Sequence, residues 1–426
     1  MKTSIFFRSF IAAVLMLGVY MAQAQQPELG YFRANDQSGL NVFETPKTDA
    51  DVPFEGVKVR VGGDFALQFQ GLSQTNSGDS LAKIGQNFNL PTANLNLDVQ
   101  LAKGVRMHMR TYLSSEHHNE TWVKGGYLQV DDLDFVSEGF LSGVMQYATL
   151  RFGMDEINYG DAHFRRSDNA RAIYNPFVGN YIMDAFTTEP FAELTVQKDG
   201  IIVVAGATNG RLNQSVINNS DKGAVLYGKV GYDKQIDEDL RVRLTGSIYT
   251  STEKSTRDNL YAGDRSGSRY YDVLGTDSNP ANFRAGRFNP SWAYRNSFMI
   301  NPFVQFQGLE VFGVFEVSSN GLKAAEADPK SGGQYTHIAA EALYRFGTSE
   351  QFYIGGRYNS VSGKDTDIAL TKEQTRINVG GGWYLTPNVL TKIEYVKQSL
   401  EGPGYANSYN EGAQFDGIVI EATIGF

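Results

Sequence analysis

The sequence predicts an all-β protein, a transmembrane, antiparallel, up-and-down β-barrel of about 16 strands with long extracellular loops and short periplasmic turns. Three observations predict this fold: many stretches with a two-residue period, links of alternating length, and a last stretch, 414–426, that ends at an aromatic residue. Strands of a membrane barrel alternate in this way because successive side chains face lipid and lumen. In the last stretch, one face of the strand carries Ile418, Ile420, Ala422, Ile424 and Phe426.

The first 24 residues have the layout of a secretory signal. Lys2 and Arg8 precede an apolar run at 10–20, and Ala22 and Ala24 are the small residues that a cleavage site requires. The apolar run is shorter than the roughly 20 residues of a membrane-spanning helix. The sequence has no cysteine, so we expect neither a cysteine-linked lipid nor a disulfide-stabilised domain. We therefore predict that residues 1–24 are a signal peptide.

Composition argues against two other classes of protein. A mean hydropathy of -0.32 together with 45 glycines is too polar for a helical membrane protein. Removing residues 1–24 takes away two of the 38 basic residues and none of the 47 acidic ones, which leaves a formal net charge of -11. A balance this acidic argues against nucleic acid as a partner.

A two-residue period predicts the strands one by one. Strand 57–71 places Val57, Val59 and Val61 on one face, whereas Lys58 and Arg60 fall on the other. The same period predicts further strands at 94–101, 105–110, 122–130, 147–153, 191–198, 201–208, 223–232, 240–250, 298–307, 309–318, 335–346, 352–361, 374–385, 389–399 and 414–426. The count is 16, and the alternatives of 14 or 18 stay open because one hairpin is easily gained or lost.

The links between these strands support a barrel over a soluble β-sandwich or a secreted adhesin. Short links at 103–104, 199–200, 234–239, 308, 347–351 and 386–388 alternate with long polar ones at 73–91, 209–222, 251–297, 319–334, 362–373 and 400–413. If the first strand runs outward, every long link except 131–146 is extracellular, and both ends of the barrel are periplasmic. Aromatic residues near strand ends predict an interfacial girdle formed by Tyr344, Phe346, Trp383, Tyr384, Tyr395, Phe415 and Phe426.

The link after the fifth strand, 154–190, is the candidate constriction of the lumen. Its charged residues have both signs: Asp155, Glu156, Asp161, His163, Arg165, Arg166, Asp168 and Arg171. Opposed charges in a narrow, water-filled opening select ions and polar solutes. The link also contains apolar residues that would be costly to expose, so we expect it to fold into the barrel: Phe164, Ile173, Tyr174, Phe177, Val178, Tyr181, Ile182, Met183 and Phe186.

Residues 150–169, LRFGMDEINYGDAHFRRSDN, resemble porins of Bacteroidota and, more loosely, the phosphate-selective porin O and P family. The resemblance implies an outer-membrane diffusion channel for small hydrophilic solutes, monomeric or homotrimeric. In the phosphate-selective members, specificity comes from ladders of Arg and Lys along the pore. This sequence departs from a dense ladder, because its inward positions mix both signs of charge.

The strand pattern predicts which charged side chains line the lumen. They are Lys58, Arg60, Arg106, Arg110, Arg241, Arg243, Glu316, Glu341, Arg345, Arg357 and Arg376. Clustered guanidinium groups bind phosphate or carboxylate, but the pattern does not tell whether these groups converge. The sequence therefore leaves ion selectivity open.

Enzyme and metal functions find little support. The sequence contains no nucleophile elbow, P-loop, zinc-protease or dinucleotide motif, and we predict neither catalysis nor a cofactor. His163 between Asp161 and Asp168 is better explained as a hydrogen-bonding loop residue. Adjacent histidines at His117 and His118 point to opposite faces of an extended chain, so no metal site is predicted there.

Residues 25–56 form an irregular amino-terminal segment of the mature chain, for which three arrangements are open: a periplasmic tail, a plug in the lumen, or a docking site for a partner. The favoured function is a passive porin, with lipid and lipopolysaccharide around it, ions or small hydrophilic solutes inside it, and a homotrimer as a family-based expectation. The alternative, motivated by 25–56 and the long link 251–297, is a structural or partner-gated barrel within a larger envelope complex.

Overall fold

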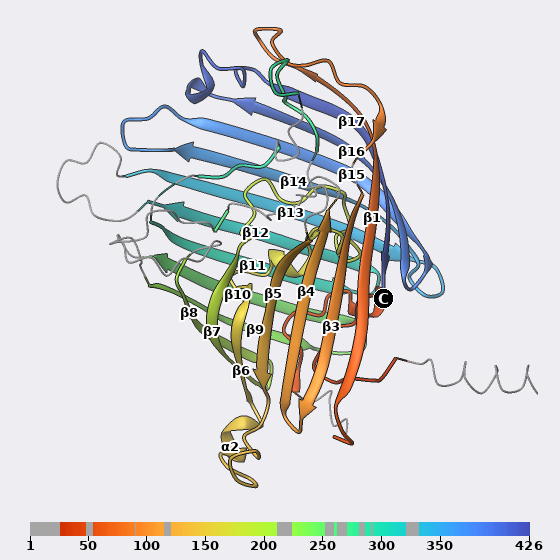
Figure 1. Cartoon of the computed structure of the whole chain (residues 1–426). Coiled ribbons are helices and arrows are strands. Elements are labelled where there is room, and N and C mark those ends of the chain that lie inside the picture. Colours follow the sequence, from red (N-terminus) through yellow and green to blue (C-terminus); the bar gives the residue numbers. More distant parts are fainter. Residues whose placement is uncertain are drawn as a thin grey trace, which may run out of the picture.

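Sixteen long strands form one closed antiparallel sheet in the computed structural model, which describes residues 26–47, 54–89, 91–114, 121–210, 224–251, 260–261, 271–280, 286–290, 292, 294–320 and 332–426 (Figure 1). The strands are β1 (Lys58–Thr75), β3 (Thr92–Ala102), β4 (Val105–Ser114), β5 (Thr121–Val130), β6 (Ala148–Glu156), β7 (Thr188–Lys198), β8 (Ile201–Thr208), β9 (Val225–Gln235), β10 (Leu240–Ser251), β11 (Asn296–Phe306), β12 (Leu309–Ser319), β13 (Gln334–Phe346), β14 (Phe352–Lys364), β15 (Lys372–Thr386), β16 (Val389–Glu401) and β17 (Gln414–Gly425).

Every strand of the barrel pairs with its neighbours in the sequence, and β17 closes the barrel against β1 between the pairs Asp64↔Gly425 and Thr75↔Gln414. Beside this ring, the two-residue β2 (Asn87–Phe88) adds to β1 and was not expected. The predicted fold class and strand count are confirmed, since all 16 predicted strands overlap the strands of the ring. Residues 1–25, which include the predicted signal peptide, lie outside the described residues.

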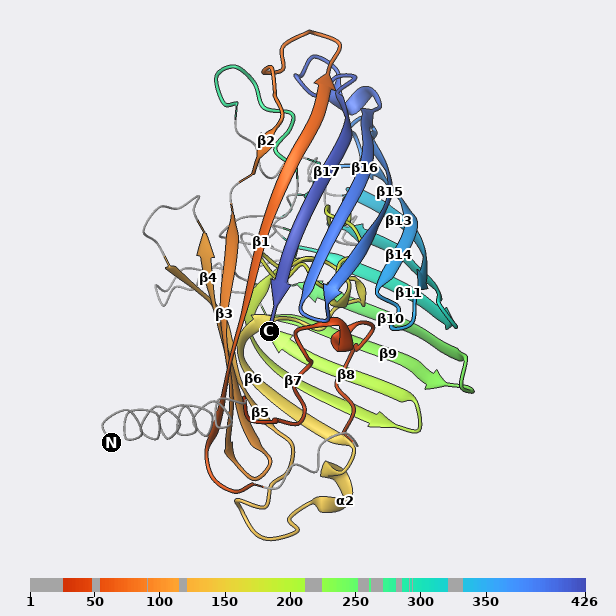
Figure 2. The same ribbon diagram turned by 90° about the vertical axis from the view of Figure 1, so that its right-hand side faces the viewer.

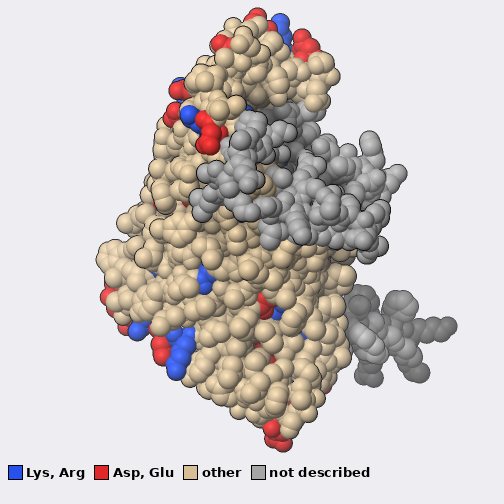
Figure 3. Space-filling view, turned by 90° about the vertical axis from the view of Figure 1, so that its left-hand side faces the viewer, with Lys and Arg blue, Asp and Glu red and all other residues tan. Residues whose placement is uncertain are grey.

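Side chains alternate between an apolar outer face and a polar inner one. In β17, Ile418 and Ile420 are exposed on the outside, whereas Val419 and Glu421 are buried inside. The outer face of the barrel shown in Figure 3 accordingly has few charged side chains over its middle. Exposing such an apolar surface costs little free energy in lipid and much in water.

Aromatic rings collect on the outside near one rim. Tyr344, Phe346, Phe352 and Trp383 form a continuous stack, with successive ring centroids 6.3, 5.6 and 5.6 Å apart. Two residues assigned to the girdle from the sequence, Tyr384 and Phe415, instead face the interior and are buried. That assignment was wrong because it used nearness to a strand end and ignored the alternation of faces.

The short links all lie at the rim that we call the turn end, and the opposite rim is the loop end. Six turns at the turn end have two to five residues between strands: 103–104, 199–200, 236–239, 307–308, 347–351 and 387–388. The seventh, 131–147, is longer and contains the short helix α2 (Ser142–Met145). Within the described ranges, no helix has the length and hydropathy needed to cross a membrane.

Candidate pore constriction

The link between β6 and β7 folds into the barrel. β6 and β7 stay paired up to Glu156↔Thr188, so the link spans 157–187, three residues shorter at each end than expected. Asp155 and Glu156 are therefore the last residues of β6 rather than loop residues. We call residues 157–187 the inward loop. At its start Gly160 has a φ of +67°, a conformation that favours glycine.

The apolar side chains of the inward loop are buried against the barrel wall and its own backbone. Phe177, Val178, Tyr181 and Ile182 are at most 1% exposed. Tyr353 and Tyr384 of the wall donate hydrogen bonds to the loop carbonyls of Pro176 and Ile173, both at 2.9 Å. The loop thus occupies the side of the lumen next to β9–β16.

Asp161 connects the start of the inward loop to β9 and β10. Its carboxylate lies 2.7 Å from Lys229 Nζ and 2.8 Å from Arg243 Nε, and it accepts a hydrogen bond of 2.7 Å from Thr245 Oγ1. All three charged side chains are completely buried. Buried charges are tolerated only when paired, so this cluster fixes the loop in one position.

Glu341 of β13 provides a second anchor. It lies 2.7 Å from Arg165 of the loop and 2.6 Å from Arg357 of β14, and Arg165 is also 3.1 Å from Glu310. A third anchor is Lys392 of β16. Its ammonium donates to three loop carbonyls at 3.0 Å each, those of Ala172, Asn175 and Phe177.

Two further charged residues of the loop, Arg166 and Asp168, face the opposite side. Arg166 pairs with Glu156 and lies 3.1 Å from Asp184. Asp168 pairs with Lys124 and lies 3.0 Å from Arg110. These pairs connect the loop to β4–β6.

Residues 26–47, which we call the N-terminal segment, also lie inside the barrel, in front of the strands when viewed from the turn end (Figure 2). Its short helix η1 (Gln37–Gly39) sits beside the turns, because Gln37 donates from its backbone to Pro387 O at 2.8 Å and from its side chain to Ser349 O at 2.9 Å. Of the three arrangements that the sequence leaves open, the described residues adopt the one in the lumen.

The N-terminal segment binds both the wall and the inward loop. Glu44 lies 2.7 Å from Arg243 and 3.0 Å from Lys229, so it joins the Asp161 cluster. Burial disfavours ionisation of Glu44, but these two cations outweigh burial and hold its pKa below the ordinary value. Asn41 donates to Glu310 at 2.7 Å and accepts from Arg165.

The link between β10 and β11 also reaches the inward loop at the places where it is described. Tyr271 donates a hydrogen bond of 2.5 Å to Glu394 Oε1, and its ring packs against Gly179. Phe288 N donates a hydrogen bond of 2.7 Å to Ile182 O. This link, which was expected to be an external loop, joins β10 to β11 at the loop end, and its described parts contact the inward loop.

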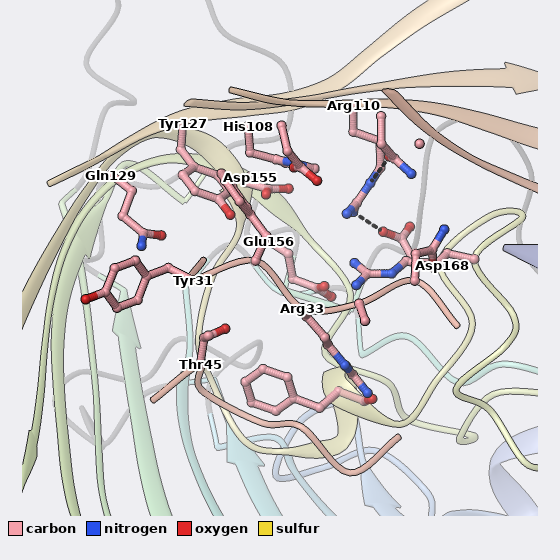
Figure 4. A pocket seen from close by; sticks show the side chains of 18 of the residues that line it. Tyr31, Arg33, Thr45, His108, Arg110, Tyr127, Gln129, Asp155, Glu156 and Asp168 are labelled. Carbon is pink, nitrogen blue, oxygen red and sulfur yellow. Dashed lines mark hydrogen bonds and ion pairs between the residues drawn. The ribbon is translucent and has the colours of Figure 1, made fainter. Parts of the chain in front are cut away.

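A cavity of about 400 Å³ remains between the N-terminal segment, the inward loop and the wall formed by β1 and β3–β7 (Figure 4). Its charged lining consists of the guanidinium groups of Arg33, Arg60, Arg110, Arg151, Arg166 and Arg171 and the carboxylates of Asp36, Glu44, Asp98, Asp155, Glu156, Asp168 and Glu193. Six cations facing seven anions do not form the dense cationic ladder of a phosphate channel. The lining is of mixed charge.

Several of these groups neutralise one another across the strands. Arg60 lies 2.7 Å from Asp98, and Arg151 lies 3.4 Å from Glu193. Arg33 and Arg171 differ, because neither has an ion pair with a carboxylate of the described residues. Both guanidinium groups instead stack on the ring of Tyr174, at 3.6 and 4.8 Å from its centroid.

The sequence-predicted residues divide into two sets. Those that line the cavity are Asp155, Glu156, His163, Arg166, Asp168, Arg171, Arg60 and Arg110. Those that lie inside the barrel but are used in contacts away from the cavity are Asp161, Arg165, Arg106, Arg241, Arg243, Glu316, Glu341, Arg345, Arg357 and Arg376. Lys58 belongs to neither set: it is the first residue of β1 and pairs with Glu55, 3.4 Å away.

The charged cavity residues that were missed include Arg33, Asp36 and Glu44 of the N-terminal segment and Arg151 of β6. Arg151 could have been found from the two-residue period, because it shares the inner face of β6 with Thr149. Arg33 lies in an irregular segment, where no sequence pattern indicates the direction of a side chain. His117 and His118, considered above for metal binding, lie outside the described ranges. Within those ranges, no group of three His, Asp or Glu residues is arranged to hold a metal ion.

No protein-family model matches the chain, and no curated protein matches it in sequence. Solved structures do match in fold. The trimer form of in-vitro folded OmpT, an outer membrane protein of Vibrio cholerae, has a TM-score of 0.52 at 10% identity, over 87% of this chain and 100% of that one. The barrel therefore has the fold of an outer-membrane protein.

Two further solved structures are similar to this chain in fold. The anion-selective porin from Comamonas acidovorans has a TM-score of 0.52 at 12% identity, over 87% of this chain and all of that one. The outer membrane channel DcaP of Acinetobacter baumannii has a TM-score of 0.51 at 10% identity, over 88% of this chain and 99% of that one. At such low identity these likenesses establish the fold alone.

Proposed function

We propose that the protein is an outer-membrane porin, through which ions and small hydrophilic solutes diffuse passively. The observation that carries this proposal is the polar, mixed-charge cavity of about 400 Å³ that remains between the inward loop, the N-terminal segment and the wall. A barrel with a stabilising role alone would gain nothing from a water-accessible lining of charged groups, since apolar packing is at least as stable. The fold is also that of solved proteins described as porins.

In this proposal the inward loop and the N-terminal segment together form the constriction. The charged groups that a solute would meet are those of the cavity lining, among them Asp155, Arg33 and Arg171. Opposed charges at close range align water and polar solutes, so size and dipole would govern passage more than net charge. The termini and the turn end would face the periplasm, lipid and lipopolysaccharide would surround the barrel, and a homotrimer is supported by the trimer form of Vibrio cholerae OmpT.

A swelling assay tests passive diffusion directly. Vesicles that contain the purified protein are placed in isotonic solutions of neutral sugars of increasing size, and the initial swelling rate is recorded. A porin with a narrow cavity should admit small sugars and show a sharp decline with size. Absence of swelling with every sugar, from protein that is correctly inserted, would argue against the proposal.

A second function, a partner-gated or structural barrel within an envelope complex, is favoured by one observation. The N-terminal segment occupies the turn end of the lumen and is bonded to the turns through Gln37. A partner that withdraws this segment would open the channel. Affinity purification from the native membrane separates the two functions, because a gated barrel should bring down a stoichiometric partner and a passive porin should not.

A further inference from the structure

One turn of the barrel has an exposed apolar surface that transport does not explain. In residues 131–147, which we call the apolar turn, Phe135, Val136, Phe140, Leu141 and Val144 are 59, 59, 44, 52 and 57% exposed. The other six turns, all of them described, have a single exposed large apolar residue, Ile236. Turns that face water are polar, so this contrast indicates a different surrounding for the apolar turn.

The backbone of the apolar turn satisfies much of its hydrogen bonding internally. Val136 N donates to Leu133 O at 2.9 Å, Val144 N to Leu141 O at 2.9 Å, and Gln146 N to Ser142 O at 3.0 Å. A backbone in contact with lipid must bond internally, because lipid offers no partners. The internal hydrogen bonds of the turn meet part of this requirement.

The inner side of the turn is fixed to the barrel. Met145 is buried in a cluster with Val130 and Ala148, and Leu133 and Leu150 pack against that cluster. The exposed side chains on the other side of α2 are thus held in place. In Figures 1 and 2 the segment projects beyond the ends of β5 and β6.

The apolar surface continues that of the barrel. On the adjoining strands, Leu128 of β5 and Phe152 of β6 are exposed on the outer face. The aromatic stack that includes Trp383 lies on the outside at the same turn end, and such rings mark the level of the headgroups. The apolar turn lies at the same end of the barrel, next to the exposed apolar residues of β5 and β6.

Two acidic side chains of the apolar turn, Asp132 and Asp134, are held on one side of it, whereas Glu138 is exposed. Asp134 lies 2.5 Å from Lys103 Nζ and accepts a hydrogen bond of 2.9 Å from Gly139 N, and Asp132 accepts one of 3.1 Å from Asp134 N. These contacts hold the carboxylates near the polar turn 103–104. These two carboxylates give the turn a charged side, as interfacial segments have.

We propose that the apolar turn inserts Phe140, Leu141 and Val144 into the acyl-chain region of the phospholipid leaflet around the turn end. The insertion adds an anchor on one side of the barrel and fixes its rotation and tilt relative to the membrane. The proposal requires only that the barrel spans a membrane, so it stands apart from any result on conductance.

The absence of cysteine from the sequence allows a clean test. Leu141→Cys and Val144→Cys are each labelled with an environment-sensitive fluorophore, and the protein is reconstituted into vesicles of phosphatidylethanolamine and phosphatidylglycerol. Quenching is measured with nitroxides on the acyl chains and with aqueous iodide. Ser349→Cys, in the polar turn 347–351, is the control for water, and Ile420→Cys, on the outer face of β17, is the control for lipid.

Insertion predicts that the labels at 141 and 144 are quenched by the acyl-chain nitroxides at least half as strongly as the label at 420. Their quenching by iodide should be several-fold weaker than that of the label at 349. Iodide quenching equal to that at 349 would overturn the proposal. Protection from both quenchers, together with cross-linking between copies through the same cysteines left unlabelled, would overturn it in favour of a second copy of the chain.

Discussion

Asp161 is the residue whose removal should loosen the inward loop most directly. Its completely buried carboxylate contacts Lys229, Arg243 and Thr245 at 2.7 to 2.8 Å. Removing one partner of a buried ion pair costs about 3–5 kcal/mol, because the remaining charges lose their counter-charge. Glu44 still faces both cations in the variant, so we expect the lower value, about 3 kcal/mol. At 1.4 kcal/mol per tenfold change, the ratio of docked to undocked loop falls roughly 100-fold.

The assay is single-channel recording of Asp161→Ala in a planar bilayer. We expect frequent transitions to a larger conductance that the native protein rarely visits, because the undocked loop widens the lumen. Asp161→Asn, which keeps the shape and the hydrogen bond from Thr245, should give an intermediate frequency. Asp134→Ala, in a turn outside the lumen, is the control and should behave as the native protein does. Native conductance and noise in Asp161→Ala would refute the anchoring role of this cluster.

Three further outcomes follow from the N-terminal segment and the cavity lining. Deleting residues 26–47 should raise single-channel conductance several-fold, because the turn end of the lumen loses its covering, and unchanged conductance would argue that the pore runs elsewhere. Arg33→Ala should shift the reversal potential under a salt gradient toward cation selectivity, since the cavity loses a guanidinium that has no ion pair with a described carboxylate. Lys58→Ala, outside the cavity, should not shift the reversal potential, and equal shifts in both variants would contradict the assignment. The pKa of Glu44 lies below its ordinary value of 4.5, so its carboxylate stabilises docking fully at any pH above 4.5. This contribution is lost only as the pH falls through the lowered pKa. Conductance measured against pH should thus stay constant from pH 7 to about 5 and rise only at lower pH, whereas a rise near pH 6 would point to a different group.

The barrel itself could be predicted because the alternation of side chains that defines it is visible within each strand. A strand that separates lipid from water must alternate its side chains, and each of the 16 strands shows this period without reference to any other part of the chain. The same alternation also identified lumen-facing residues such as Glu341 and Arg357. Tyr384 and Phe415 were misassigned where strand-end position was used in place of the alternation.

The filling of the lumen could not be predicted in the same way. The N-terminal segment and the inward loop have irregular backbones, so no period indicates which side chains face the wall. Their positions depend on long-range ion pairs, such as that between Glu44 and Arg243, which neither segment reveals alone. The sequence marked the charged residues of the inward loop as facing the pore, but Asp161 and Arg165 are used to attach the loop to the wall.

The most direct test of a narrowed but open channel is single-channel conductance of the purified native protein, with reversal potential recorded under a salt gradient. The mixed-charge cavity predicts small, ohmic steps with weak ion selectivity. Protein that inserts correctly yet passes no current would contradict an open lumen, and would mean that the N-terminal segment closes the barrel.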